Sequence, residues 1–154
     1  MRSTLLFALI GAISVGLVSA AVAASIPLVR TAHNAKLNAT VLVARNSHTL
    51  YDLSVERKGR FICTTKFCLS LWTPLVVAKG TKPTGSVALA TIKRPDGTLQ
   101  VTYKGAPLYT FNEDTKAGDV KGQGFKDVGI WHAASTTAVK KTTPAPAPGG
   151  YSSP

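Results

Sequence analysis

Two cysteines are the residues of this chain with the clearest chemistry. Cys63 and Cys68 stand in the stretch CTTKFC, with four residues between them. In an oxidising compartment, two cysteines this close in sequence favour a local disulfide. A redox-active dithiol is the alternative, although its usual spacing is two residues in a strand-to-helix context. A metal site would need further ligands, and the three histidines show no paired ligand spacing, so we predict a disulfide and neither a metal nor another cofactor.

A tyrosine followed five residues later by a carboxylate occurs twice, as Tyr51 with Glu56 and as Tyr109 with Asp114. A half-buried tyrosine hydroxyl needs a polar partner, and a carboxylate just beyond the strand can accept its hydrogen bond. The same carboxylate can equally cap backbone N–H groups of the turn. Both roles are structural, and we expect one of them at each motif.

The other catalytic or ligand-binding motifs that we considered are incomplete or absent in this sequence. The loop NEDTKAGDVKGQG (residues 112–124) is rich in carboxylates, but Lys116 takes a ligand position of the EF-hand pattern and no glutamate closes the loop. The chain has neither a Gly-x-Ser-x-Gly nucleophile motif nor a His-Glu-x-x-His metal motif. His132 is the best single candidate for chemistry, but a lone histidine is more often structural or exposed. We therefore predict no catalytic residue and a protein that is not an enzyme.

These motifs belong to an internal repeat. Sliding the chain against itself by 58 residues aligns the two tyrosines and the two carboxylates, and one extra residue in the second copy aligns the two tryptophans. Two copies are too few for a solenoid, so we expect one compact pseudo-symmetric domain, with repeats at about 41–78 and 98–134. The aligned pairs are Val43 with Val101, Tyr51 with Tyr109, Leu53 with Phe111, Glu56 with Asp114 and Trp72 with Trp131.

The local pattern of each repeat is that of β-strands. The runs VALATIKR and TLQVTYK flank a Pro-Asp-Gly sequence at 95–97, which predicts a tight turn between antiparallel strands. In LYTF the side chains of Tyr109 and Phe111 share one face, and we expect the tryptophan that closes each repeat to pack there. Only TKFCLSLW suggests a short helix. The predicted fold class is all-β, mainly antiparallel, with two pseudo-symmetric repeats in one small sandwich or barrel-like domain and little helix.

The two ends of the chain differ from its centre. Residues 1–24 combine Arg2, an uncharged apolar run and a small-residue end, which predicts a cleaved signal peptide; an uncleaved membrane anchor is the alternative. No cysteine is available there for a lipid anchor. Residues 140–154 are rich in Pro, Ala, Gly and Ser, which predicts a disordered tail. Between them we expect a lead-in at 25–40 and the β domain at 41–139 of a periplasmic or secreted protein, with no membrane span after cleavage.

Positive charge is concentrated before the second tyrosine motif. The chain has a formal net charge of +11, and residues 30–104 hold 12 basic but only 3 acidic residues. A solvated basic face is one explanation, and attraction to a polyanion is the other. In an exported protein the polyanion would be lipid head groups, lipopolysaccharide or a wall polymer, and no nucleic-acid recognition motif is present. The candidate anion-binding residues, close to the cysteines, are Arg57, Lys58, Arg60 and Lys66.

The motifs of the two repeats follow one another in a specific order. In the second repeat, YTFNED at residues 109–114 is followed by the glycine-rich stretch 118–124 and then by Trp131. The first repeat runs from Tyr51 through the cysteine pair to WTPL at residues 72–75. In this order the chain resembles a bacterial secreted repeat family of unknown function, described as predicted lipoproteins with a Tyr-x-aromatic-x-x-Asp motif.

The resemblance implies export and a repeated β module, and it implies no established reaction. The first repeat departs from the family pattern at Leu53 in place of an aromatic residue, at Glu56 for aspartate and at Thr73 for a proline. Many relatives carry a lipid-anchoring cysteine that this chain lacks. We therefore expect an exported cell-envelope protein, a non-enzymatic binding or structural module whose basic face meets anionic envelope polymers or lipid head groups. The alternative is a periplasmic redox or metal-handling protein that works through Cys63 and Cys68.

Overall fold

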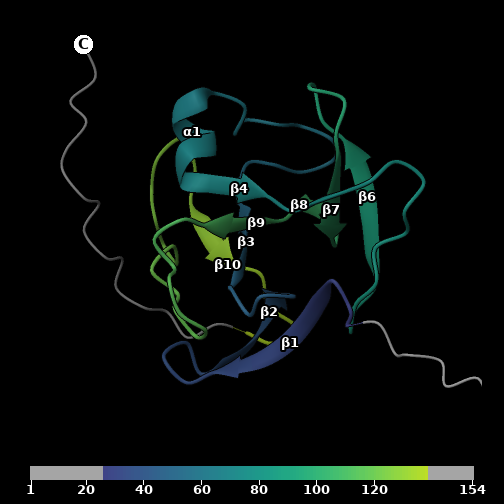
Figure 1. Cartoon of the computed structure of the whole chain (residues 1–154). Helices are drawn as coiled ribbons and strands as arrows, with labels where there is room; N and C mark the ends of the chain where they lie inside the picture. The colour runs from purple at the N-terminus through teal and green to yellow at the C-terminus, as the bar shows by residue number, and fades with distance from the viewer. Residues whose placement is uncertain (1–25, 139–154) are drawn as a thin grey trace, which may run out of the picture.

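The structure, a computed structural model, describes residues 26–138 of the chain. The predicted signal peptide at 1–24 and the predicted tail at 140–154 lie outside these residues. The described part of the chain forms mostly antiparallel strands and one short helix (Figure 1), which confirms the predicted fold class. Within residues 26–138, no helix is long and apolar enough to cross a membrane.

The elements follow one another twice in a similar order: a hairpin, a short central strand and a strand that begins with tryptophan. In the first half the order is β1 (Val29–Asn34), β2 (Ala39–Ala44), β3 (Leu50–Leu53), α1 (Lys66–Leu71), β4 (Trp72–Pro74) and β5 (Val76–Val77). In the second half it is β6 (Leu89–Lys93), β7 (Leu99–Tyr103), β8 (Ala106–Pro107), β9 (Tyr109–Phe111) and β10 (Trp131–Ala133).

The central sheet, with the strand order β10-β3-β9-β4, joins the two repeats. Its middle pair is β3 with β9, antiparallel, and Tyr51 lies directly opposite Tyr109. On one side, β10 of the second repeat pairs with β3 of the first. On the other side, β4 of the first repeat pairs with β9 of the second. Every strand pair of this sheet therefore joins one repeat to the other, and neither repeat forms the sheet alone.

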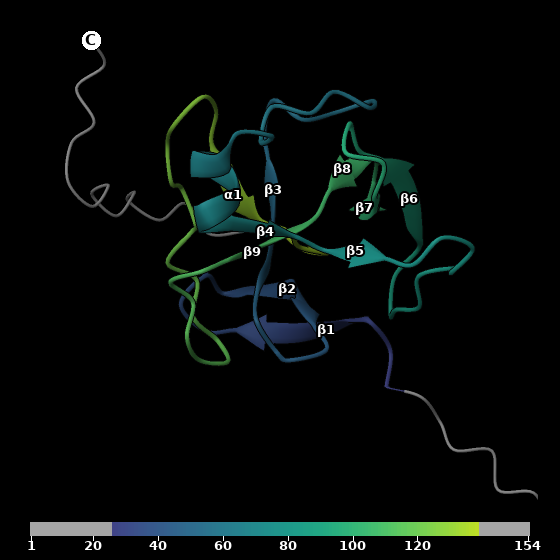
Figure 2. The same ribbon diagram turned by 45° about the horizontal axis from the view of Figure 1, so that its top comes forward.

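Two hairpins, β1–β2 and β6–β7, flank the central sheet (Figures 1 and 2). β5 and β8 extend the second hairpin as further neighbours of β7. Between the hairpins and the central strands lies a buried apolar cluster that includes Leu42, Leu50, Val101 and Leu108. The packing is sandwich-like, which was one of the two predicted alternatives, and none of the three sheets among the described residues closes on itself.

The hairpins correct one detail of the predicted repeat alignment. The backbone N–H of Leu42 donates to the carbonyl of Ala134 at 2.7 Å, and that of Val101 donates to the carbonyl of Leu75 at 2.8 Å. Each of these carbonyls lies three residues after the tryptophan that closes a repeat. Leu42, not Val43, is therefore the counterpart of Val101. The difference arises because the turn at residues 45–47 in the first repeat is one residue longer than the turn at 104–105 in the second.

Two predicted local structures are confirmed. The Pro-Asp-Gly turn connects β6 to β7: Gly97 has a φ of 88°, a conformation that favours glycine, and Asp96 accepts a hydrogen bond from the backbone N–H of Thr98 at 2.9 Å. The short helix is α1, whose first turn is capped by Thr65, since its hydroxyl accepts from the backbone N–H of Cys68 at 3.3 Å.

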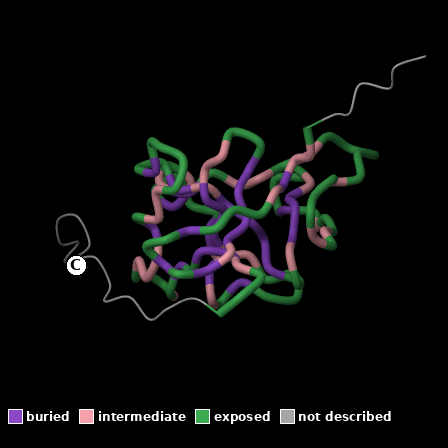
Figure 3. Tube along the Cα trace, turned by 90° about the horizontal axis from the view of Figure 1, so that it is seen from below, coloured by how far each residue is buried: buried purple, intermediate pink, exposed green. Residues whose placement is uncertain are grey.

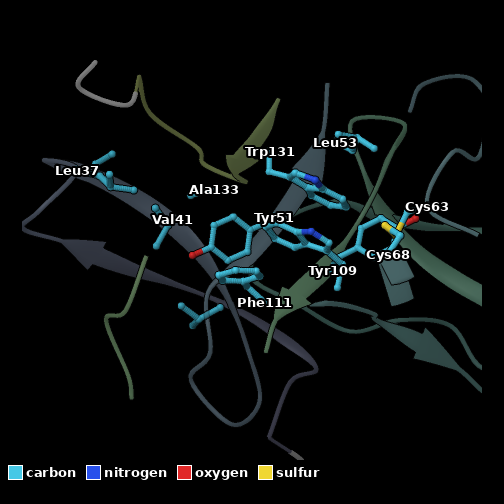
Figure 4. Packing of buried hydrophobic residues seen from close by; sticks show 13 residues of the cluster. Leu37, Val41, Tyr51, Leu53, Cys63, Cys68, Tyr109, Phe111, Trp131 and Ala133 are labelled. Atoms are coloured by element: carbon cyan, nitrogen blue, oxygen red, sulfur yellow. A yellow bond between two sulfur atoms is a disulfide. The ribbon is translucent and has the colours of Figure 1, made fainter. Parts of the chain in front are cut away.

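Aromatic rings fill the main core, which lies in the middle of the molecule (Figures 3 and 4). The indoles of Trp72 and Trp131 stack with their ring centres 3.7 Å apart and their planes at 7°. Tyr51 meets Trp72 edge-on at 5.4 Å, and Tyr109 meets Trp131 edge-on at 5.1 Å. The prediction that each closing tryptophan packs on the face that bears the tyrosines is therefore confirmed, and the two repeats meet at the stacked indoles.

The exchange of strands between repeats predicts the behaviour of fragments. Fragments 26–80 and 81–138, divided in the exposed segment after β5, are each expected to lack cooperative urea unfolding when produced alone. Mixed one-to-one, they are expected to assemble, because each supplies the strands that the other needs. Near-UV circular dichroism follows the assembly, since the stacked pair takes Trp72 from one fragment and Trp131 from the other. Cooperative unfolding of either fragment by itself would contradict the exchanged pairing.

Candidate functional site: the tyrosine–carboxylate network and the basic loop

The two tyrosine–carboxylate motifs are hydrogen-bonded across the repeats. The Tyr51 hydroxyl donates to Asp114 Oδ2 at 2.5 Å, and the Tyr109 hydroxyl donates to Glu56 Oε2 at 2.7 Å. All four side chains are buried. Because β3 and β9 run antiparallel side by side, the chain that leaves each strand passes the tyrosine of the other. Each tyrosine thus bonds the carboxylate of the opposite repeat, not its own.

The second oxygen of each carboxylate holds the loop that follows it. Glu56 Oε1 accepts hydrogen bonds from the backbone N–H groups of Ile62 and Cys63, at 2.6 and 2.7 Å. Asp114 Oδ1 accepts from the backbone N–H of Lys121 at 2.9 Å. Both roles that the sequence left open therefore occur together, and each carboxylate ties a surface loop to the centre of the molecule.

A buried arginine that the sequence analysis missed completes the network. Arg94 donates to the carbonyl of Cys63 at 2.8 Å, to the Tyr109 hydroxyl at 3.1 Å, and to the side-chain oxygen of Gln100. At the equivalent position of the first repeat stands Asn34, whose amide donates to the carbonyl of Gly118 at 3.1 Å. The only signal in the sequence was a basic residue at the end of a β-prone run, directly before a turn.

Burial sets the protonation of the network. Burial and then the negative charge of the partner carboxylate raise the pKa of Tyr51 and of Tyr109 well above their ordinary value. Burial also raises the pKa of Asp114, against the hydrogen bonds from Tyr51 and from the backbone of Lys121. Both phenols are therefore neutral donors at physiological pH, and the network is suited to hold structure.

The two cysteines form the predicted disulfide, with a Cα–Cα distance of 5.4 Å. Cys63 is fully buried in the main core, and its backbone is held by both Glu56 and Arg94. Closing so short a loop contributes about 2 kcal/mol by the chain-entropy relation. The disulfide thus fastens the same loop that Glu56 ties to the centre.

The four predicted anion-binding residues do not share one environment. Arg57 is committed internally: it pairs with Asp52 at 2.8 Å and donates to the carbonyls of Leu53 and Glu56. The cations of Lys58, Arg60 and Lys66 are exposed, and within residues 26–138 they have no acidic partner. Their role in anion binding stays a prediction.

Exposed aliphatic side chains lie next to the start of this basic loop. Val55, Val128 and Ile130 are 38, 65 and 37% exposed, and their segments are joined by two 2.9 Å hydrogen bonds between Ser54 and Ile130. From this junction the loop that bears Lys58 and Arg60 runs toward the second hairpin (Figure 2), where a Cβ at Gly59 would stand 3.5 Å from Ile92 Cδ1. We call this surface the apolar–basic end, made of Val55, Lys58, Arg60, Lys66, Lys126, Val128 and Ile130.

The other candidate residues for chemistry either hold a loop or lie exposed on the surface. In the loop at 112–124, Asp119 accepts hydrogen bonds from the backbone N–H groups of Thr115 and Lys116, both at 3.1 Å. His132 is exposed on β10, opposite Asp52 of β3. In the part of the chain that the structure covers, no group of three or more His, Cys, Asp or Glu side chains is placed to hold a metal ion.

The fold and the network define a β module built from two repeats that complete one another. Residues 90–135 match the family model Lipoprotein_15, described as a secreted repeat of unknown function. The match spans most of the second repeat, including Tyr109, Asp114 and Trp131, and it confirms the resemblance read from these motifs. The description of this family gives no activity. No curated protein and no solved structure matches the chain.

Removing the carboxylate of Glu56 is expected to destabilise the fold strongly. In Glu56→Ala the N–H groups of Ile62 and Cys63 and the hydroxyl of Tyr109 lose their acceptor, which should lower the unfolding free energy by about 3 kcal/mol or more. Glu56→Gln keeps one carbonyl oxygen and should lose less. Urea unfolding followed by tryptophan fluorescence measures both. Glu113→Ala, at an exposed acid, is the control and should stay within about 0.5 kcal/mol of wild type; equal losses in E56A and E113A would contradict the network.

The raised pKa of Asp114 predicts the sign of a pH effect. Because burial makes ionisation of Asp114 costlier in the folded state than in the unfolded chain, its contribution to stability falls as pH rises through the window between the two pKa values. The unfolding free energy of wild type minus that of Asp114→Asn should therefore decrease as pH rises from about 3 to 6. Glu113→Gln controls for the loss of one negative charge in the same loop. A difference that increases over this range would show that the hydrogen bonds outweigh burial.

Proposed function

We propose that this protein is a non-enzymatic module, exported to the periplasm or beyond, that binds anionic membrane surfaces. The observation that carries the proposal is the apolar–basic end, where Lys58, Arg60 and Lys66 lie without acidic partners among residues 26–138. The loop of Lys58 and Arg60 starts beside exposed aliphatic side chains, at the bonds between Ser54 and Ile130. Cations attract lipid phosphates, and aliphatic side chains gain by entering the boundary between head groups and acyl chains. An anionic polymer in water would use only the cations, so the mixed surface favours a lipid bilayer.

The loop that bears Lys58 and Arg60 is fixed before it meets a ligand. Glu56 binds the backbone at the end of the loop, and the disulfide at Cys63 fastens the chain there. At its start, Arg57 is held by its contacts with the end of β3. A loop that is already ordered loses little conformational freedom on binding, which supports a role as a contact surface.

The non-enzymatic part of the proposal rests on how the titratable groups are used. Glu56 and Asp114 each spend both carboxylate oxygens on internal hydrogen bonds, and the two tyrosines are their partners. Cys63 lies in the core beneath Arg94, which supports a structural disulfide over the redox alternative. The residues left for function are therefore surface cations and apolar side chains.

Vesicle co-sedimentation tests the proposal with the chain from residue 25 onward. Binding to phosphatidylglycerol-containing vesicles should exceed binding to phosphatidylcholine vesicles and should weaken with salt. At about 1 kcal/mol for each cation, K58Q/R60Q/K66Q should bind about 10²-fold more weakly. The matched control K36Q/K82Q/K104Q removes the same charge from exposed positions elsewhere and should change binding by at most about threefold. Equal losses in the two triple variants would reject the apolar–basic end as the contact surface.

A second variant separates a lipid surface from a soluble polyanion. V128S/I130S keeps every charge and should weaken vesicle binding about tenfold, because apolar area is lost at the contact. Its binding to soluble polyphosphate should equal that of wild type. If vesicle binding were unaffected in V128S/I130S, the ligand would be an anionic polymer recognised by charge alone.

A further inference from the structure

The inner faces of the two hairpins are equivalent in position, but the side chains on them differ in size. The register places Thr31 opposite Leu42 in the first hairpin and Thr91 opposite Val101 in the second. Residues 30, 32 and 34 of β1 therefore correspond to residues 90 and 92 of β6 and to residue 94, which directly follows β6. The neighbouring pairs are Ala32 with Val41 in the first hairpin and Ile92 with Gln100 in the second, and Asn34 takes the place of Arg94.

In the second hairpin, the space between the inner face and the loop that covers it is filled by side chains. The loop at 59–63 lies over it, so that a Cβ at Gly59 would stand 3.5 Å from Ile92 Cδ1. The guanidinium of Arg94 lies 5.0 Å from the ring centre of Phe61 and bonds the carbonyl of Cys63. Large side chains from the hairpin and from the loop thus pack against each other.

In the first hairpin the same space is open. The corresponding loop is held by Asn34, which donates to the carbonyl of Gly118 at 3.1 Å, and by Thr49, which donates to the carbonyl of Asp119 at 2.7 Å. Beneath it lies a cavity of about 350 Å³, within the range of small-molecule sites. Small residues leave it open, namely Ala32, Val41, Val43, Ala117 and Gly118.

The polar groups of this cavity favour an anion. No acidic side chain lines it, and its charged wall is Arg30. One guanidinium nitrogen of Arg30 is held by the Ser47 hydroxyl at 2.9 Å and by the carbonyl of Arg45 at 3.3 Å. Arg30 Nε is buried and has no hydrogen-bond partner, and no carboxylate pairs with Arg30 among residues 26–138. An oriented guanidinium that no carboxylate neutralises suits a carboxylate or a phosphate group.

We propose that this cavity binds a small organic anion, with its carboxylate or phosphate group at Arg30 and its hydrocarbon part against Ala32, Val41 and Val43. The site is built from β1, β2 and the loop at 117–119. It shares no residue with the apolar–basic end and does not depend on membrane binding.

NMR titration of the chain from residue 25 onward tests the site with three probes: inorganic phosphate, butyl phosphate and butyrate. Butyl phosphate should shift the backbone amides of Arg30, Ser47 and Gly118, and it should bind about tenfold more tightly than inorganic phosphate because its chain covers the apolar floor. Butyrate against butyl phosphate shows which anionic group is preferred. Unperturbed amides at these three positions with all three probes would overturn the proposal.

Three variants locate the binding. Arg30→Gln should weaken butyl phosphate binding at least about tenfold. Arg45→Gln removes the same charge from the adjacent turn, outside the cavity, and should weaken binding no more than about threefold. Ala32→Ile places in the first hairpin the residue that fills the second at position 92, and it should abolish binding while the folded spectrum is retained. Equal losses in R30Q and R45Q, or full binding by A32I, would reject the site.

Discussion

The hydrogen bonds that cross between the repeats, from Tyr51 to Asp114 and from Tyr109 to Glu56, are the constraint on which the structure depends. A buried hydroxyl or carboxylate without a partner costs about 1–3 kcal/mol or more. Each repeat contains one buried tyrosine hydroxyl and one buried carboxylate, and the hydrogen-bond partner of each lies in the other repeat. The same carboxylates fix two surface loops. The sheet, the core and the loops therefore form together, around the stacked indoles.

On this shared frame the two halves have diverged at their loops. In one, a disulfide, Arg94 and Phe61 pack the loop tightly onto its hairpin and turn its cations outward. In the other, Asn34 replaces the arginine, and a cavity remains under the loop. The two proposed contacts, with a lipid surface and with a small anion, both follow from this asymmetry. A duplicated scaffold thus offers two different surfaces, because its interior bonds leave the outer loops free to vary.

The secreted repeat matched at residues 90–135 corresponds to only part of the cooperative unit. That segment contains β7, β9 and β10 but takes β3 and β4 from the first repeat to complete its sheet. A single repeat has no complete core of its own, since every pair in the central sheet is an exchange. The folding unit of this chain is therefore the pair of repeats.

Local features were decided by the sequence itself: the disulfide at Cys63 and Cys68, the Pro-Asp-Gly turn, the short helix, and the presence of two similar β units with aromatic faces. These depend on residues within a few positions of one another, where spacing and backbone preference suffice. The tertiary structure alone decided that each tyrosine bonds the carboxylate of the other repeat, because partners 53 and 63 residues apart leave no mark in a local pattern. It also decided the burial of Arg94 and the open space beside Asn34, since whether a side chain is enclosed depends on which distant loop passes over it.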